Sequence, residues 1–111
     1  MSDGKKIVKL SDTSYAEVEK DEYNPLIKRR KIVLKIHHPN EGTPMRIMLR
    51  MTLAEAFGVD MERLYIRNIF TEYGKGESTA IVHIYDNVER ALQFEPKFVI
   101  ERNGGVKGFE E

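Results

Sequence analysis

Four segments of the chain alternate apolar and polar residues, which is the pattern of a β-strand with one buried face. In the clearest segment, Ile32, Leu34 and Ile36 share one face. The turn signal Asn24-Pro25 precedes that segment. The predicted strands are Tyr15–Lys20, Lys31–His38, Glu62–Thr71 and Thr79–Tyr85. The last two are expected to form a long hairpin through residues 73–77.

Helical spacing follows the second predicted strand and recurs near the C-terminus. Thr43 before Pro44 predicts a helix start, and Gly58 predicts its end. The apolar face of this helix is predicted to contain Met45, Met48, Leu49, Thr52, Leu53 and Ala56. A second helix is predicted over residues 87–94. For residues 97–102 a short helix is favoured, and an edge strand stays open.

The elements follow the order β-β-α-β-β-α. They predict an α+β fold, with a four-stranded antiparallel sheet and flanking helices. The 111 residues suit one domain, predicted over residues 14–104. Residues 1–13 and 105–111 are polar and lack periodicity, so we expect flexible ends.

Charge is balanced overall and unevenly distributed along the chain. Lysine and arginine number 18, as do aspartate and glutamate. Residues 28–50 nevertheless hold seven positive charges against Glu41 alone, a net charge of +6. Such a basic block is typical of a surface that binds a polyanion. Consecutive charges at a strand entrance cannot be buried without partners, so we expect residues 28–31 to point outward.

Other chemistry finds little support in the sequence. The chain has no cysteine, and His37 and His38 would point to opposite faces of a strand, so no metal site is expected. No nucleophile motif or phosphate-cradling loop is present, so we expect no catalysis. No apolar run approaches the roughly 20 residues of a membrane span, and we expect a soluble, intracellular protein.

Several short motifs follow one another along the chain. The first runs from Asn24 to Arg30 as Asn-Pro-Leu-Ile-Lys-Arg-Arg. The others are His38-Pro39, Gly42-Thr43-Pro44 with Arg46, Tyr65-Ile66-Arg67, the segment from Phe70-Thr71 to Gly74, His83-Ile84-Tyr85-Asp86, Glu95-Pro96 and Arg102-Asn103-Gly104. Together they resemble the ribosomal protein S24e family, a family of small-subunit proteins. The resemblance covers residues 14–104. The chain lacks the long basic C-terminal tail of eukaryotic members, so the archaeal type is expected.

The resemblance implies a structural constituent of the small ribosomal subunit that binds folded ribosomal RNA, with no catalysis and no cofactor. The segment Ser78–Tyr85 lacks the aromatic core of the common single-stranded RNA readers, so we expect contacts mainly to backbone phosphates. The RNA-binding candidates are Asn24, Lys28, Arg29, Arg30, Lys31, Thr43, Arg46, Arg50, Arg67 and Lys75.

The expected partners are ribosomal RNA and neighbouring small-subunit proteins, with no membrane. We expect a monomer when isolated, and a place on cytoplasmic ribosomes. The alternative hypothesis is a protein-interaction module, whose acidic C-terminal half binds a basic partner through Glu89, Glu95 and Glu101.

Overall fold

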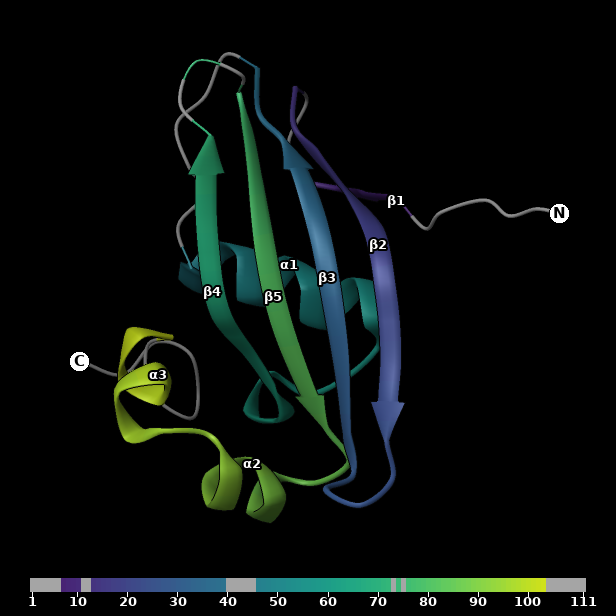
Figure 1. Ribbon diagram of the computed structural model, residues 1–111, viewed down its shortest axis with the longest axis vertical. Helices are drawn as coiled ribbons and strands as arrows, with labels where there is room; N and C mark the ends of the chain where they lie inside the picture. The colour runs from purple at the N-terminus through teal and green to yellow at the C-terminus, as the bar shows by residue number, and fades with distance from the viewer. Residues whose placement is uncertain (1–6, 11–12, 40–45, 73, 75, 104–111) are drawn as a thin grey trace, which may run out of the picture.

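The computed structural model describes residues 7–10, 13–39, 46–72, 74 and 76–103. Their order is strand, strand, strand, helix, 3-10 turn, strand, strand, helix, helix (Figure 1). The elements are β1 (Ile7–Lys9), β2 (Tyr15–Asn24), β3 (Arg29–His37), α1 (Arg46–Phe57), η1 (Met61–Arg63), β4 (Leu64–Glu72), β5 (Glu77–Tyr85), α2 (Val88–Phe94) and α3 (Lys97–Arg102).

The strands form one antiparallel sheet in the order β1-β2-β3-β5-β4. Helix α1 crosses behind the sheet, whereas α2 and α3 lie at one end of it (Figure 1). The α+β class, the antiparallel pairing and the β4–β5 hairpin confirm the sequence-based prediction. The prediction of four strands in the order β-β-α-β-β-α is wrong, because the described residues form five strands in the order β-β-β-α-β-β-α-α.

The additional strand, β1, lies in the segment predicted to be a flexible end. Its central residue Val8 pairs with Ala16 of β2. The Val8 side chain is only 5% exposed and packs into the core. A three-residue strand with one buried side chain gives no measurable alternation, so its pattern could not be recognised.

Strand β2 is longer than predicted and reaches the first residue of the predicted turn signal. It continues to Asn24, past a register shift between Val18 and Lys20. The turn follows directly, where the side-chain oxygen of Asn24 accepts a hydrogen bond from the Leu26 amide at 3.0 Å. Lys28 closes the turn with a φ of 52°. The Asn24-Pro25 signal therefore marked the turn correctly, but β3 begins at Arg29 rather than Lys31.

The main core lies between α1 and one face of the sheet, which we call the core face. Ile32, Leu34 and Ile36 are fully buried there, as the alternation predicted. The contributing helical residues are Leu49, Leu53 and Ala54. The predicted helical stripe was partly wrong, because Met48 is 59% exposed and Ala56 is also exposed. Met45 lies outside the described residues.

Glycine ends α1 as predicted. Gly58 follows the last helical residue with a φ of 67°, in the left-handed region where a side chain is disfavoured. The predicted start at Thr43-Pro44 lies outside the part of the chain that the structure describes.

A smaller core lies on the opposite face of the sheet, which we call the open face. Tyr65 and Tyr85 are fully buried there against Ala91 of α2 and Val99 of α3. Asn87 caps α2 by accepting a hydrogen bond from the Arg90 amide at 2.9 Å. The favoured helix after Glu95-Pro96 is confirmed as α3.

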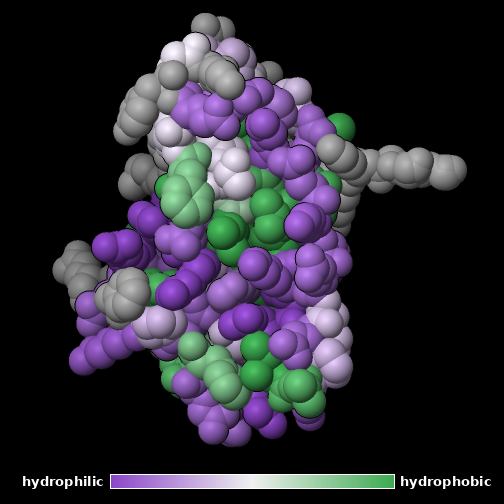
Figure 2. Space-filling view, in the orientation of Figure 1, coloured by the Kyte–Doolittle hydropathy of each residue, from purple (hydrophilic) through white to green (hydrophobic). Residues whose placement is uncertain are grey.

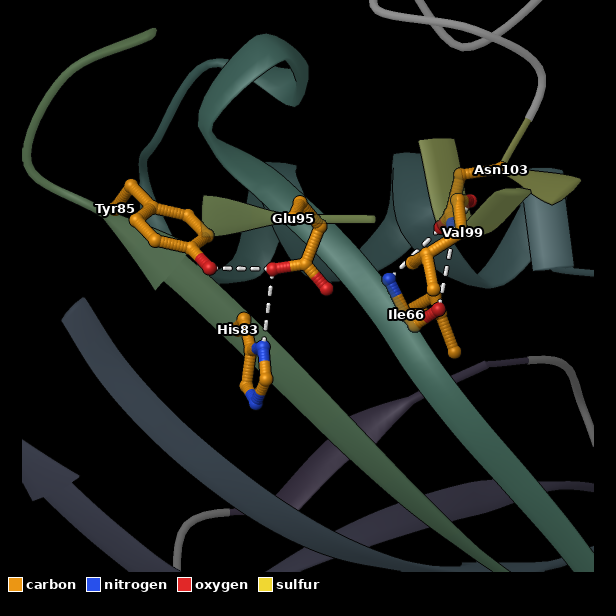
Figure 3. A network of polar contacts seen from close by, with 6 residues as sticks. All are labelled: Ile66, His83, Tyr85, Glu95, Val99 and Asn103. Atoms are coloured by element: carbon orange, nitrogen blue, oxygen red, sulfur yellow. Dashed lines mark hydrogen bonds and ion pairs between the residues drawn. The ribbon is translucent and has the colours of Figure 1, made fainter. Parts of the chain in front are cut away.

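Asn103 joins the end of α3 to the edge strand β4. Its side-chain oxygen accepts from the Ile66 amide at 2.8 Å, and its nitrogen donates to the Ile66 carbonyl at 2.9 Å (Figure 3). The same nitrogen donates to the Val99 carbonyl at 2.7 Å. The amide group thus pairs with an edge residue as a neighbouring strand would, and positions α3 beside β4.

Candidate nucleic-acid interface

Strand alternation divides the basic block between the two faces of the sheet. Arg29 pairs in register with Tyr85 and Lys31 with His83, so both lie on the open face. Arg30 pairs with Ile84 and lies on the core face. The three consecutive cations therefore do not form one surface.

Arg30 already has partners on its own face. Its Nε donates to Asp21 Oδ1 at 2.7 Å, and its Nη2 donates to the other carboxylate oxygen. The guanidinium also lies 5.2 Å from the centre of the Phe57 ring. This bidentate pair raises the pKa of Arg30. Arg30 thus belongs to a charge pair next to α1.

Two cations of the basic block, Arg29 and Lys31, line a pocket on the open face beside the α2–α3 junction. Its volume is about 390 Å³. Three basic side chains contribute from two strands, Arg29 and Lys31 from β3 and Arg67 from β4. The other lining residues are Asn68, Ile81, His83, Phe94, Glu95 and Pro96. We refer to it as the basic pocket.

A second hollow adjoins the basic pocket at the end of β2. It has a volume of about 320 Å³ and shares Arg29 and Lys31 with the basic pocket. Asn24 lines it, together with Glu22, Tyr23 and Pro25. Lys28 is exposed in the adjacent turn. Figure 2 shows this face as largely hydrophilic, with hydrophobic areas over the sheet and at the α2 end.

An irregularity in β4 places two residues in the basic pocket. The register shifts between Ile66, which pairs with Val82, and Asn68, which pairs with Ile81. Arg67 is the extra residue of this bulge, and both it and Asn68 line the pocket. Simple alternation puts neighbouring residues on opposite faces of a strand, so it predicts Arg67 on the open face and Asn68 on the core face. For this reason the sequence did not identify Asn68 as a candidate site residue.

A buried carboxylate holds the wall of the basic pocket to the sheet. Glu95, at the α2–α3 junction, is 5% exposed. Its Oε2 accepts hydrogen bonds from His83 Nδ1 at 3.1 Å and from the Tyr85 hydroxyl (Figure 3). Sequence reasoning placed Glu95 on an acidic docking surface, which is wrong because this side chain is enclosed by β5. Glu89 and Glu101 are exposed.

These contacts shift the protonation equilibria of both acidic partners. Burial alone would raise the pKa of Glu95, but hydrogen bonds from His83 and Tyr85 and the charges of His83 and Arg67 outweigh it and lower the pKa. Burial and the hydrogen bond to Glu95 raise the pKa of Tyr85 to about 12, against the opposing effect of Arg29. The pair is therefore a carboxylate and a neutral phenol at neutral pH.

Arg50 requires a correction, because it is completely buried rather than on the surface beside Arg46. Its Nε donates to the Leu64 carbonyl at 2.7 Å, and Nη1 donates to the Asn103 carbonyl at 2.9 Å. Nη2 donates to the Met61 carbonyl at 2.6 Å. The guanidinium also lies 4.5 Å from the centre of the Tyr65 ring. In this fold it cannot reach a phosphate group.

The other predicted contacts lie apart from the basic pocket or outside the described residues. Arg46 is half-buried at the first residue of α1. Thr43 and Lys75 fall in segments that the structure does not describe. Within the described ranges, no group of three or more histidine, cysteine or acidic side chains could hold a metal ion. None of the helices described is long and apolar enough to cross a membrane.

The structure thus defines an α+β protein whose antiparallel sheet carries a basic, hollowed open face. Comparison with protein families matches residues 15–104 to the family described as ribosomal protein S24e. The chain belongs to this family, as its motifs predicted. Membership of a family of ribosomal proteins also confirms the expectation that the chain is not an enzyme.

Curated relatives from archaea carry the name small ribosomal subunit protein eS24. The relative from Saccharolobus islandicus strain M.16.4 is 37% identical over 100 residues, which cover 90% of this chain and 83% of the relative. The relative from Pyrobaculum arsenaticum is 40% identical over 85 residues, covering 77% of this chain and 70% of the relative. The expected archaeal type agrees with these sources.

Replacing Arg50 by lysine tests its structural role. In Arg50 three different nitrogen atoms reach the three carbonyls, whereas the donors of a lysine ammonium all radiate from one atom. Arg50→Lys should therefore leave carbonyls unpaired and lower the free energy of unfolding by about 3 kcal/mol. Urea denaturation measures this change, and exposed Arg102→Lys is the control, expected to stay within about 0.5 kcal/mol. Unchanged stability together with weakened RNA binding would show that Arg50 reaches RNA after all.

The lowered pKa of Glu95 predicts a pH-dependent contribution to stability. Because the folded-state pKa lies below the ordinary value of 4.5, the carboxylate stabilises the fold above that pH. This contribution is lost as the pH falls through the folded-state pKa. Glu95→Gln is therefore expected to be less stable than the original chain at pH 7, with the difference shrinking as the pH falls below 4.5. Thermal unfolding across this range measures it, with exposed Glu89→Gln as the control. A pH-independent difference would contradict the assignment.

Proposed function

We propose that this protein is a structural component of the small ribosomal subunit, and that it binds folded ribosomal RNA through the open face of its sheet. Membership of the S24e family supports the place in the subunit. The observation that supports the surface is the convergence of Arg29, Lys31 and Arg67 on one pocket.

The chemistry of the basic pocket suits a phosphate backbone. Arginine donates in a planar fork that matches two phosphate oxygens, and lysine adds a compact charge. Arg29 and Lys31 are two residues apart on one strand, which separates their Cα atoms by roughly 6.6 Å. Adjacent phosphates of one RNA strand lie at a comparable spacing. Consecutive phosphates can therefore follow β3, and Arg67 faces them from β4.

Contacts next to the basic pocket extend the proposed interface. Lys28 is exposed in the β2–β3 turn, and Asn24 lines the hollow that shares Arg29 and Lys31. Arg46, Thr43 and Lys75 stay candidates for separate RNA contacts. Arg30 is left out of the interface because its guanidinium is paired with Asp21 on the core face.

The proposed function also implies the partners, the cellular location and the oligomeric state of the protein. Its partners would be ribosomal RNA and neighbouring small-subunit proteins, on ribosomes in the cytoplasm. Before assembly it would be a monomer. The mainly electrostatic contacts position the protein on RNA and supply little base specificity.

Fractionation of a native cell lysate on sucrose gradients tests the place in the subunit. The protein is expected to sediment with the small subunit at low salt and to stay there at moderate salt, since many contacts act together in an assembled particle. Detection by antibody across the gradient measures this. Presence in the light soluble fractions alone, at both salt concentrations, would contradict the proposal.

Salt dependence of RNA binding tests the interface itself. With Lys28, Arg29, Lys31 and Arg67 on phosphates, log affinity for archaeal small-subunit RNA should fall against log salt with a slope of roughly −2.8 to −3.6. Arg29→Ala and Lys31→Ala should each reduce the magnitude of that slope by about 0.7 to 0.9. Filter binding measures the slope.

Arg30→Ala is the matched control for the salt experiment. It removes an adjacent arginine of the same strand, on the other face, and should leave the slope unchanged. A flat salt response, or equal effects of Arg29→Ala and Arg30→Ala, would show that the open face is not the interface.

A further inference from the structure

We propose that the basic pocket takes one unstacked nucleotide of the RNA, and that it favours a base with an amino group over uracil. This inference rests on the proposed function, because it assigns a ligand to the same surface. It adds base recognition to an interface that the sequence led us to expect would contact mainly phosphates. Three features of the pocket carry it, namely its size, its mixed walls and an unused acceptor.

The size of the basic pocket exceeds what a phosphate group needs. At about 390 Å³ it falls near the lower end of the roughly 300–1,000 Å³ typical of small-ligand sites. A surface that contacts only RNA phosphates needs exposed cations. It does not need a pocket between the sheet and the α2–α3 junction. A planar base with its sugar phosphate is a ligand of suitable dimensions.

The walls of the pocket combine apolar and cationic groups, as a nucleotide requires. Phe94 is 43% exposed at the end of α2, which leaves part of its ring available for stacking. Ile81 and Pro96 supply further apolar surface. Arg29 and Lys31 lie on the adjoining strand to receive the phosphate. Proteins that bind unpaired RNA commonly stack bases on aromatic rings next to basic grooves.

The acceptor is the second carboxylate oxygen of Glu95. Oε2 already receives hydrogen bonds from His83 and Tyr85, whereas Oε1 is buried and has no hydrogen-bond partner among the described residues. In Figure 3, Oε1 points away from Tyr85. This oxygen has almost no accessible surface, and Glu95 is one of the lining residues, so a group that enters the pocket comes close enough to donate to it. An unpaired buried acceptor is unfavourable, so a donor has an energetic reason to bind there.

The charge of Glu95 determines which bases can donate. Its lowered pKa keeps the carboxylate ionised, so it accepts hydrogen bonds and donates none. Adenine, cytosine and guanine each carry an amino group that can donate to Oε1. Uracil carries two carbonyl oxygens beside its single N–H, and those oxygens are repelled by the carboxylate. Asn68, also in the lining, can donate or accept at the base edge.

Titration of the isolated protein with mononucleotides tests the base preference. The probes are AMP, CMP, GMP, UMP and ribose 5-phosphate, followed by the backbone amide signals in ¹H–¹⁵N spectra. Shifts are expected at residues 67–68, 81–83 and 94–95, with the best amino-bearing nucleotide bound about tenfold more tightly than UMP. Equal affinity for ribose 5-phosphate and all four nucleotides would overturn the inference, because it would reveal a phosphate site without base recognition.

Two variants on the same helix separate stacking from general effects. Phe94→Ala removes the ring and should weaken binding of the preferred nucleotide by roughly 5- to 100-fold. Leu92→Ala removes a 50% exposed apolar side chain outside the pocket lining, and should leave binding unchanged. Because both side chains are exposed, neither variant is expected to unfold. Equal effects of the two variants would overturn the inference.

The same variants distinguish this inference from the proposed function. If Phe94→Ala leaves affinity for small-subunit RNA unchanged while Arg29→Ala lowers it, RNA binding by the open face stands and the nucleotide pocket is wrong. If neither change alters RNA affinity, both proposals are wrong. Loss with both variants, and retention with Leu92→Ala, supports the nucleotide pocket on an RNA-binding face.

Discussion

The buried guanidinium of Arg50 is the interaction on which the arrangement of this fold depends. It extends from α1 and donates to carbonyls of η1, β4 and the end of α3, through Met61, Leu64 and Asn103. A buried charge is costly unless such donors are all satisfied, so this geometry allows few alternatives. Arg50 thereby connects the helix on the core face with the helices on the open face, around the edge of β4.

The open face depends on this connection because α3 has only six residues, and polar bonds add to the packing of its Val99 in the smaller core. Asn103 bonds to Ile66 at the β4 edge, and Glu95 bonds to His83 and Tyr85 in β5. These two polar attachments position the α2–α3 junction over the sheet and create a hollow beside it. The basic pocket is therefore a consequence of how the C-terminal helices attach, and its walls come from β3, β4, β5, the end of α2 and the α2–α3 junction.

A neutral chain can present a polyanion-binding surface because its charges are sorted by face. Arg29 and Lys31 lie on the open face, whereas Arg30 is neutralised by Asp21 on the core face. The separation comes from the two-residue period of a strand, which turns a run of like charges into two surfaces. Net charge is thus a poor guide to the binding capacity of this small domain.

The sequence alone determined the α+β class, the antiparallel strands, the end of α1 at Gly58 and the basic character of the segment that begins β3, because alternation, helix capping and charge are local properties. It also identified the family through ordered motifs. Only the tertiary structure decided which cations lie together. Arg50 and Glu95 are polar residues that can be buried only because they have hydrogen-bond partners. One partner of Arg50 lies 53 positions away in the sequence, and one partner of Glu95 lies 12 positions away, and no local pattern encodes such partners. The strand β1 and the bulge at Arg67 likewise arise from pairing across the sheet, which a single strand's sequence does not specify.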